Sequence, residues 1–527
     1  MKQLGGGGFS AYLRRSRRRA VARVATALRL VISVVIGEKS AEAIVVGLKQ
    51  VGESKMTRLN NETRGATTQR RAESIMEDQT EHPVLLLKPN SFEEDNRTLS
   101  EKESPRRHTL VDVLCPENLQ RAWKRVKANK GAAGVDSMGV GEFPAFMQQH
   151  GKAVLQKLRE GSYKPSPVKQ CRIPKDNGEY RTLGIPTVLD RVIQQAIAQT
   201  LTPFYESQFH EHSYGYRPNK SAQGAMQKVH EMVKPRSKGC HVVDCDLKAF
   251  FDTVDHQKLV TKLRENIADP ELLGLILKYL KAGAITPQGD FIRSPQGVPQ
   301  GGPLSPLLAN ILLDELDSEL TSRGHDFVRY ADDFVVLCNS LIAGTKILRS
   351  ITAFLRDRLK LTVNANKSKV VPLSEASFLG FRIHRNRIRW TDKAKRRFKA
   401  EVRRLTKRTR GVSPRSVYID LRHYLRGALN YYMVGVSFKE VRELDHWIRR
   451  RVRVYYWKQW GRPRTRRLKL LKLGAARDRV KLASRSRKGP WRIANVEVVR
   501  FAMPNTWLEE QGLHSLEKQW VSARYPV

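Results

Sequence analysis

Cysteine is scarce in this sequence: its 527 residues include five, namely Cys115, Cys171, Cys240, Cys245 and Cys338. They form no CxxC pair and no paired framework, so neither a disulfide scaffold nor a structural zinc site is expected. Unpaired thiols fit a reducing compartment best, and we expect the protein to be cytoplasmic.

Uninterrupted apolar runs are missing as well. Residues 20–37 are apolar in part, but Arg23 and Arg29 interrupt them, and the segment is too short and too charged to span a membrane. We therefore expect no membrane partner. The segment has a faint likeness to an Arg-rich targeting peptide, but we favour a basic, disordered extension over residues 1–105, which also contain a glycine run and a polar stretch of mixed charge.

Acidic residues are few in proportion to basic ones: 52 Asp and Glu stand against 96 Lys and Arg, a formal net charge of +44. Such a chain repels itself unless a polyanion neutralises it, and nucleic acid is the ordinary polyanionic partner. An anionic membrane surface is the rival. We rank it lower because the basic residues are spread over several hundred positions, and we expect a nucleoid-associated protein.

From about residue 106 the sequence is typical of a folded protein, and 40% of the chain is hydrophobic. Strand-like and helix-like segments are interleaved, which predicts an α+β fold. The predicted helices cover residues 118–128, 188–205, 345–359, 421–434 and 441–457. The predicted extended segments cover residues 163–174, 239–247 and 378–390, and residues 327–337 are predicted to form a hairpin.

Two adjacent carboxylates occupy the centre of the predicted hairpin, in the sequence Tyr330-Ala331-Asp332-Asp333. A hairpin would expose both carboxylates at its tip, and a divalent cation would relieve their repulsion. Mg²⁺ is usually held by one or two carboxylates together with substrate phosphates. A solvated turn is the plainer interpretation of an Asp-Asp pair, and this segment alone does not exclude it.

A second acidic segment favours the metal-binding interpretation. Asp244 and Asp246 lie on one face of the predicted strand by alternation. If this strand lies beside the hairpin, Asp246 and Asp332 can together hold two metal ions, which would activate a 3′-hydroxyl and stabilise a leaving pyrophosphate. Asp244 can equally be a solvent-facing residue of the strand.

These acids carry a family resemblance. The sequence YADD resembles the YxDD box of reverse transcriptases, and DLKAFFD resembles their preceding acidic motif. The resemblance implies a right-hand polymerase with Asp246 and Asp332 as principal ligands of two Mg²⁺ ions, and Asp333 as the third acid. The backbone carbonyl of Leu247 would reach a metal, and Phe251 would screen the 2′ position of the sugar. An ordinary core phenylalanine would also fit Phe251.

Further motifs resemble the nucleotide-contacting parts of the same family. Gln300, in the sequence PQGGPLSP, would hydrogen-bond a nucleotide that the glycines let approach closely; a turn that starts a helix is the alternative, and both can hold. Lys175 and Arg181 match the fingers motif and would clamp the triphosphate, unless they are only basic residues of an exposed hairpin. Lys367, after Asn364, would protonate pyrophosphate as general acid.

The flanking sequences narrow the resemblance to bacterial group II intron reverse transcriptases. HSYGYRP, LRGALNYY and LDHWIRRRVR resemble segments of that group, and the last looks like its thumb and maturase domain, domain X, which grips intron RNA. Arginines there would meet phosphates, and exposed aromatics would stack on bases. The alternative is a core role for Trp447, Trp457 and Trp460, which we expect for most of them.

By this resemblance the chain comprises the extension (1–105), fingers and palm (106–382), a mainly helical thumb and maturase domain (383–475), and a basic C-terminal segment (476–527). That last segment is either the folded end of domain X or a small DNA-contacting region. Many family members end in an HNH-type endonuclease with cysteine pairs, and because no cysteine follows Cys338 we do not expect one here.

The implied function is that of an RNA-directed DNA polymerase and maturase, which binds its group II intron RNA, assists splicing and copies the RNA into DNA during intron mobility. Its partners would be the intron RNA, a DNA target or primer, and deoxynucleoside triphosphates; a homodimer is compatible with the sequence. A splicing factor with a vestigial polymerase is one alternative, which the loss of an acid would have favoured. A domesticated host reverse transcriptase is another, against which domain X argues.

Overall fold

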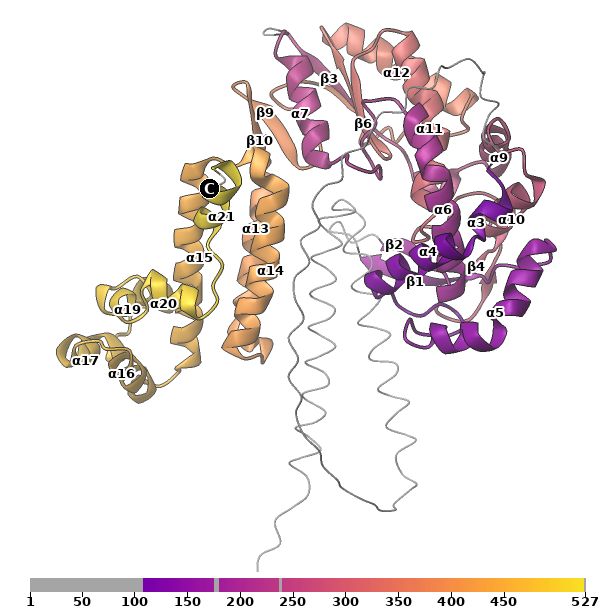
Figure 1. The fold of residues 1–527 in the computed structure, drawn as a ribbon. Helices are drawn as coiled ribbons and strands as arrows, with labels where there is room; N and C mark the ends of the chain where they lie inside the picture. The colour runs from indigo at the N-terminus through magenta and orange to yellow at the C-terminus, as the bar shows by residue number, and fades with distance from the viewer. Residues whose placement is uncertain (1–107, 175–179, 237–238, 526–527) are drawn as a thin grey trace, which may run out of the picture.

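The computed structural model describes residues 108–174, 180–236 and 239–525. In Figure 1 the N-terminal helices and the C-terminal helices stand on opposite sides of the molecule, and the sheet that contains β3 and β6 lies above and between them. Strands and helices are interleaved up to β10, after which only helices follow, so the predicted α+β fold is confirmed. The predicted N-terminal extension falls outside the described residues.

The first sheet has the strand order β2-β1-β4-β5. β1 (Val168–Pro174) and β2 (Tyr180–Ile185) are antiparallel, β4 (Ala284–Ile285) runs parallel to β1, and β5 (Phe291–Ile292) forms the edge. The predicted extended segment 163–174 is therefore a strand from Val168 onward.

A long helix, α6 (Val188–Gln208), is central to the N-terminal half because most of its side chains before Leu201 are buried. Thr187 caps it by accepting a hydrogen bond from the Asp190 amide at 3.1 Å. The predicted helices at 118–128 and 188–205 are confirmed. The other helices of this half are α3 (Leu110–Val113), α4 (Pro116–Asn129), α5 (Phe143–Arg159), α8 (Phe250–Thr253), α9 (His256–Arg264) and α10 (Pro270–Lys281).

The second sheet is antiparallel with the order β6-β7-β3-β8. Its strands are β3 (His241–Asp246), β6 (Phe327–Tyr330), β7 (Asp333–Cys338) and β8 (Lys369–Pro372). The predicted strand at 239–247 and the predicted hairpin at 327–337 are confirmed. α7 (Ala222–Val233) packs on β6, and α12 (Leu341–Asp357) packs on β3, β7 and β8. α11 (Ser305–Ser322) leads into β6 and is buried along much of its length.

Alternation along β3 divides the apolar interior into two cores. Val243 and Cys245 face the core that includes α6, α11 and α12, whereas Val242 belongs to the core shared with α7 and the C-terminal helices. Asp244 and Asp246 are on the same side of the strand as Val242. The strand therefore presents its acids on the face of the sheet opposite α12.

The C-terminal half begins with a β-hairpin, β9 (Phe381–His384) and β10 (Arg387–Trp390), within the predicted extended segment 378–390. The long helices α13 (Asp392–Leu405), α14 (Pro414–Tyr432) and α15 (Phe438–Gln459) follow, with the short 3₁₀ turns η1 (Arg408–Arg410) and η2 (Met433–Gly435) between them. α15 contains the predicted helix at 441–457. The predicted helix at 421–434 lies in α14 up to Tyr432, and its last two residues belong to η2.

Six shorter helices complete the chain: α16 (Pro463–Lys472), α17 (Arg477–Arg485), α18 (Pro490–Ile493), α19 (Glu497–Ala502), α20 (Asn505–Glu510) and α21 (Leu516–Arg524). α21 folds back on α14 and α15. Asp445 of α15, 1% exposed, accepts hydrogen bonds from the Ser515 hydroxyl at 2.9 Å and the Leu516 amide at 3.1 Å. A carboxylate at a helix N-terminus is favourable, so Asp445 fixes the end of the chain to the longest helix of this half.

Candidate active site

The hairpin brings the three predicted acids to one place. Asp246, the last residue of β3, is the register partner of Asp333, the first residue of β7. Tyr330 pairs with Asp333 across the hairpin, so Ala331 and Asp332 form a two-residue loop. Asp246, Asp332 and Asp333 are all partly exposed. The strand of Asp246 therefore does lie beside the hairpin, as the metal-binding interpretation requires.

The acids share a face as well as an edge. Directly opposed residues of an antiparallel pair point to the same side of a sheet, which places Asp246 and Asp333 together on the side away from α12. Val335, two residues after Asp333, belongs to the core of that same side. Asp244 is opposite Val335 and lies one step further from the loop.

A segment after α12 holds Asp246 from the other side. The Asp246 amide donates to the Ser368 hydroxyl at 3.0 Å, and the Asn364 side chain donates to Asp246 Oδ2 at 3.1 Å. Lys367 Nζ lies 3.3 Å from the same carboxylate oxygen. Lys367 is thus brought to the acids. Ser368 was not among the predicted site residues, and its position next to Lys367 in the same motif was the available signal.

The donor set fits a divalent cation of the Mg²⁺ type. Mg²⁺ takes hard oxygen ligands, commonly one or two carboxylates, and completes its shell with water and substrate phosphate. Asp246, Asp332 and Asp333 supply such oxygens at the end of a sheet, and the buried Leu247 follows Asp246 directly. Over the described ranges, no group of three or more His, Cys, Asp or Glu side chains is already arranged around a metal position.

Two neighbouring phenylalanines after β3 differ in burial. Phe250 is 2% exposed and belongs to the core, whereas Phe251 is only partly buried and packs edge to face on it, with ring centroids 5.2 Å apart. Phe250 is therefore an ordinary core phenylalanine. Phe251 keeps part of its surface near the end of β3, where a sugar-screening residue would be expected.

The glycine-rich loop of residues 297–302 joins the two sheets. The Val298 amide donates to the Phe251 carbonyl at 2.6 Å, and the Gly184 amide of β2 donates to the Gln300 carbonyl at 2.7 Å. Gly301 has φ +122°, and a Cβ there would lie 2.4 Å from the Gly184 carbonyl oxygen. The Gln300 side chain is partly exposed and donates to Asp252 at 3.4 Å. This loop also leads into α11, so the interpretation as a turn that starts a helix is confirmed. The contact of Gln300 with a nucleotide stays a prediction.

Arg181 is the second residue of β2, paired with Ile173 of β1, and its side chain is half-buried. Lys175, its predicted partner in binding a triphosphate, falls outside the described residues. The structure therefore locates only the arginine of this predicted clamp, on the first sheet.

The arginine-rich segment of α15 contains two buried arginines that form contacts inside the C-terminal half. Arg449 is paired with Asp445 at 3.0 Å, and Arg453 donates to the Met503 carbonyl at 2.9 Å; both are 7% exposed. Burial lowers the pKa of Arg453 to about 10. These two arginines therefore brace the C-terminal helices, and the expectation that the segment as a whole faces phosphates is wrong for them.

The tryptophans follow the expectation that most are core. Trp457 and Trp460 are 1% and 8% exposed, whereas Trp447 is partly exposed, with Arg403 5.6 Å from its ring centroid. Trp491 carries Arg450 over its ring at 4.0 Å. Trp447 and Trp491 therefore each combine accessible aromatic surface with a neighbouring cation.

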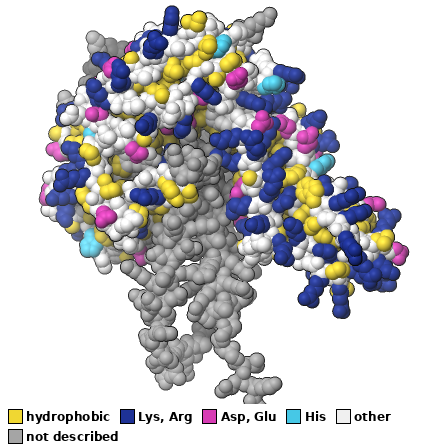
Figure 2. Space-filling model, turned by 180° about the vertical axis from the view of Figure 1, so that it is seen from behind, with side chains coloured by type: hydrophobic (Ala, Val, Ile, Leu, Met, Phe, Trp, Pro, Cys, Tyr) yellow, Lys and Arg dark blue, Asp and Glu magenta, His cyan; other side chains and the backbone are white. Residues whose placement is uncertain are grey.

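Exposed basic residues gather instead on α13 and on the shorter helices after α15. Figure 2 shows Lys and Arg side chains crowded over the C-terminal helices, with few acidic side chains among them. Residues 382–410 alone contain 14 Lys or Arg and two acids. On α13, Lys393, Arg396 and Arg403 are exposed. This half presents a surface that suits a polyanion.

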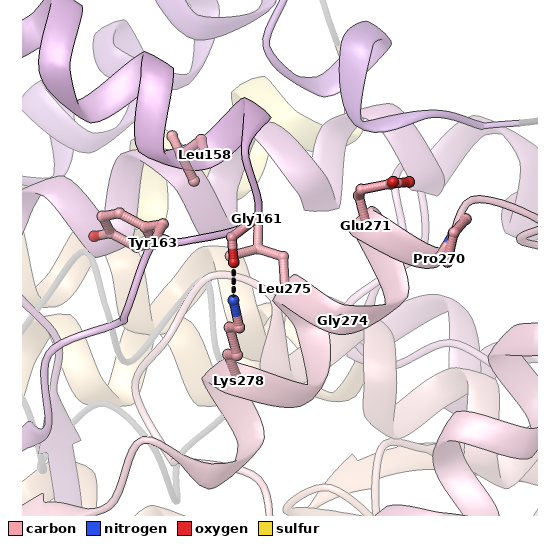
Figure 3. Close-up of a pocket in the computed structure, with 8 residues that line it drawn as sticks. All are labelled: Leu158, Gly161, Tyr163, Pro270, Glu271, Gly274, Leu275 and Lys278. Atoms are coloured by element: carbon pink, nitrogen blue, oxygen red, sulfur yellow. Dashed lines mark hydrogen bonds between the residues drawn. The ribbon is translucent and has the colours of Figure 1, made fainter.

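A small cavity of about 180 Å³ lies away from the acids, between the end of α5 and α10 (Figure 3). Lys278 closes one side by donating a hydrogen bond to the Gly161 carbonyl. Tyr163, which also lines the cavity, donates a hydrogen bond to the buried Asp190 at 2.7 Å. The lining contains one acid, Glu271, and no pairing of chemical groups that would catalyse a reaction.

No helix of the described chain is both long enough and apolar enough to cross a membrane. The partly apolar stretch at residues 20–37 lies outside the described residues.

Two family models match this chain. Residues 173–383 match "Reverse transcriptase (RNA-dependent DNA polymerase)", and residues 395–474 match "Group II intron, maturase-specific domain". The first range contains all three acids and the glycine-rich loop. The second covers α13 to α16, which carry the basic surface.

Curated relatives agree with these matches. The chain is 33% identical over 317 residues to protein YkfC of Escherichia coli (strain K12), covering 53% of this chain and 83% of that one. It is 29% identical over 366 residues to the group II intron-encoded protein LtrA of Lactococcus lactis, covering 56% of this chain and 59% of LtrA. It is 26% identical over 355 residues to a putative COX1/OXI3 intron 2 protein of Saccharomyces cerevisiae, covering 55% and 40%.

Proposed function

This chain belongs to the family of group II intron reverse transcriptases and maturases, and we propose that its three paired acids carry out RNA-directed DNA synthesis on a group II intron RNA that its C-terminal helices hold. The observation that carries the proposal is the register of β3 and β7, which sets Asp246 opposite Asp333 and beside Asp332. The chain spans 59% of LtrA's length, so its substrates and partners are part of the proposal.

Polymerases of this family depend on a divalent metal, and we propose two Mg²⁺ ions held by Asp246, Asp332 and Asp333 with the Leu247 carbonyl. Bound there, such ions would lower the pKa of the primer 3′-hydroxyl and offset the charge on the leaving pyrophosphate. The protein's own contribution is to keep the carboxylates together at the end of the sheet. Asn364 and Ser368 hold the backbone and carboxylate of Asp246 for that purpose.

Lys367 is proposed to act on the leaving group. Its ammonium lies 3.3 Å from Asp246 Oδ2 and its side chain is 59% exposed, so it can turn from the carboxylate to a phosphate once metal occupies the acid. A protonated lysine there would donate its proton to pyrophosphate as it departs.

The incoming deoxynucleoside triphosphate is proposed to lie between the two sheets, over the glycine-rich loop. Gln300 would hydrogen-bond it, Phe251 would exclude a 2′-hydroxyl, and Arg181 with Lys175 would bind its phosphates. The loop suits this role because it contacts both the segment after β3, at Phe251, and β2, at Gly184. One loop therefore couples the nucleotide-binding residues of the first sheet to the acids of the second.

The basic helices are proposed to bind the intron RNA, and by holding it folded to assist its splicing. The same RNA would be the template, and a DNA target would supply the primer. A protein so engaged would be found with the nucleoid. Within residues 476–525, α18 and α21 pack against α15, and α21 also packs against α14, which favours the folded end of domain X over a free DNA-contacting segment.

The test is primer extension on intron RNA with Mg²⁺ by the purified chain and by Asp332→Ala. We expect cDNA from the parent and a loss of at least about 1,000-fold in the variant, as for removal of a group that acts in the reaction. Asp244→Asn is the matched control, because it changes a carboxylate on the same face, two residues from Asp246. Equal cDNA from parent and Asp332→Ala would reject the assignment of the acids.

A splicing assay on the same preparations addresses the alternative of a splicing factor with a vestigial polymerase. Asp332→Ala should splice the intron as the parent does, because Asp332 lies in the loop between β6 and β7 and not on the basic helices. A parent protein that splices but makes no cDNA would favour that alternative.

A further inference from the structure

A fully buried arginine, Arg329, lies two residues before the Ala331-Asp332 loop. Arg329 of β6 is 0% exposed, and its Nε donates to Asp317 Oδ1 at 2.7 Å while its Nη2 donates to Oδ2 at 2.5 Å. Its remaining nitrogen, Nη1, donates to Asn310 Oδ1 at 2.9 Å and to the Ala331 carbonyl at 3.2 Å. A buried charge is costly unless it is paired and hydrogen-bonded, and this guanidinium is both.

The arginine links the catalytic turn to α11. Asp317 and Asn310 are both residues of α11, at 0% and 1% exposure. Asn310 extends the contact, because its Nδ2 donates to the Gly215 carbonyl at 2.8 Å. The turn, a long buried helix and the segment around Gly215 are therefore joined through one set of side chains.

The segment around Gly215 covers the open edge of β6. The Arg329 amide donates to the His212 carbonyl at 3.0 Å, and the Tyr214 amide donates to the Arg329 carbonyl at 2.8 Å. At Gly215 a Cβ would lie 2.2 Å from the Ala331 nitrogen, so only glycine lets this segment lie against the turn. The sequence HSYGYRP, which resembles a segment of the family, thus packs directly against the turn.

The turn itself needs such support. Ala331 has φ +58°, a left-handed conformation that costs a residue with a Cβ about 1 kcal/mol or more. A strained conformation persists only where its surroundings over-determine it. The Arg329 guanidinium holds the Ala331 carbonyl and Gly215 packs on the Ala331 nitrogen, so both sides of this peptide are fixed.

From this geometry we infer that Arg329, Asp317, Asn310 and Gly215 are positioning residues, which fix the Ala331-Asp332 loop so that Asp332 meets the metal jointly with Asp246. The inference rests on the proposed role of Asp332 as a metal ligand. None of the four side chains needs to touch substrate. Their effect is on the placement of the Asp332 carboxylate, for which a shift of about 0.5 Å is already significant.

The experiment measures Mn²⁺ binding to the full chain by the loss of the free-ion EPR signal, without substrate, for the parent, Arg329→Lys and Asn310→Ala. Lysine keeps a charge for Asp317 but lacks the planar fork that also reaches Asn310 and Ala331. We expect both variants to bind Mn²⁺ about 10–100-fold more weakly at the site that Asp332→Ala abolishes, the range found for residues that orient metal ligands.

Kinetics separate positioning from folding. In primer extension, both variants should need correspondingly more Mg²⁺ for half-maximal rate and show a lower kcat, with KM for the primer–template unchanged. Asp445→Asn is the matched control: it alters another buried Arg–Asp pair, with Arg449, far from the turn. It should lower the melting temperature while leaving Mn²⁺ binding and the Mg²⁺ requirement as in the parent.

Variants that melt earlier but bind Mn²⁺ like the parent would overturn the inference and leave the network with a stabilising role only. Failure of the proposed function has a different signature. A parent that binds Mn²⁺ through Asp332 but makes no cDNA would reject the proposed function, while the comparison of Mn²⁺ affinities would still decide this inference.

Discussion

Asp246 is held by contacts from two separate parts of the chain, β7 and residues 364–368. β7 lies opposite it, Ser368 and Asn364 bind its amide and carboxylate, and Lys367 approaches the same carboxylate. A single carboxylate held in this manner loses little further freedom when a cation binds. Preorganised ligands of this kind reduce the entropy cost of metal binding.

At the residue scale, Phe251→Ala should weaken discrimination against ribonucleotides. Removing the half-buried ring opens space where a 2′-hydroxyl would lie, and steric selection of this size is worth about 10–200-fold. The measurement is the ratio of kcat/KM for a deoxynucleotide and the matching ribonucleotide. An unchanged ratio would show that the ring of Phe251 does not face the sugar.

Phe250→Leu is the matched control for this prediction. Phe250 is buried in the core and contacts the ring of Phe251, so the change should lower the free energy of unfolding by about 1 kcal/mol, as other volume-reducing core substitutions do. The ratio of kcat/KM for the deoxynucleotide to kcat/KM for the ribonucleotide should remain that of the parent.

At the scale of elements, the start of α6 is organised around one buried carboxyl group. Asp190 accepts hydrogen bonds from the hydroxyls of Thr187, Tyr163 and Tyr279, at 2.6, 2.7 and 3.2 Å. Burial raises the pKa of Asp190, and the hydrogen bonds oppose that rise. This cluster ties α6 to α10 and to the strand-leading segment that supports the first sheet.

The raised pKa of Asp190 predicts a pH dependence of stability. An acid with a raised folded-state pKa stabilises the fold fully below its unfolded pKa, and loses that contribution as pH rises through the folded pKa. The difference in unfolding free energy between the parent and Asp190→Asn should therefore shrink as pH increases from about 3.9, the unfolded value. Urea unfolding at a series of pH values measures it.

Tyr163→Phe tests the cause of that dependence. The tyrosine hydroxyl lowers the pKa of Asp190 by donating to it, so its removal should move the same loss of stability to higher pH. A difference between the parent and Asp190→Asn that instead grows with pH would contradict the assignment of a raised pKa.

At the scale of the whole molecule, charge is distributed unevenly. The acids are set at the end of the second sheet, whereas exposed Lys and Arg side chains crowd the C-terminal helices (Figure 2). α13 and α14 stand on the side of that half nearer to the N-terminal helices (Figure 1). A nucleic acid held by α13 would therefore be attracted along a basic surface toward the part of the molecule that carries the acids.

Removing the positive charges on the exposed face of α13 should lower the affinity for RNA and make that affinity less dependent on salt concentration. For Lys393→Gln, Arg396→Gln and Arg403→Gln combined, the slope of log affinity against log salt should fall by about 2–3, because each phosphate contact releases roughly one counterion. Intron RNA binding at several salt concentrations measures the slope.

The matched control removes the same charge from α12, which covers the face of the sheet opposite the acids. Lys346 and Arg349 of α12 and Arg358, the residue that follows its last turn, are exposed. Their replacement by Gln should leave the slope near that of the parent. If the α12 and α13 variants show equal decreases in the slope of log affinity against log salt, then net charge, and not a defined surface, governs RNA binding.

Prediction from sequence was most accurate where structure depends on neighbouring residues. The helices at 118–128 and 188–205 and the hairpin at 327–337 follow from local apolar periodicity and turn chemistry, and they are present. The short strands β4, β5 and β8 were not predicted. Each is two to four residues long and forms through pairing with distant strands, which leaves little pattern in the sequence.

The sequence by itself determined which acids this protein has, the alternation that puts Asp244 and Asp246 on one face, and the surplus of positive charge. Only the tertiary structure decided that Asp246 stands opposite Asp333, that Arg449 and Arg453 are buried, and that Arg329 donates a hydrogen bond to the Ala331 carbonyl. The physical reason is sequence distance: the partners of these groups are separated by up to about ninety positions, and a local pattern carries no information about them.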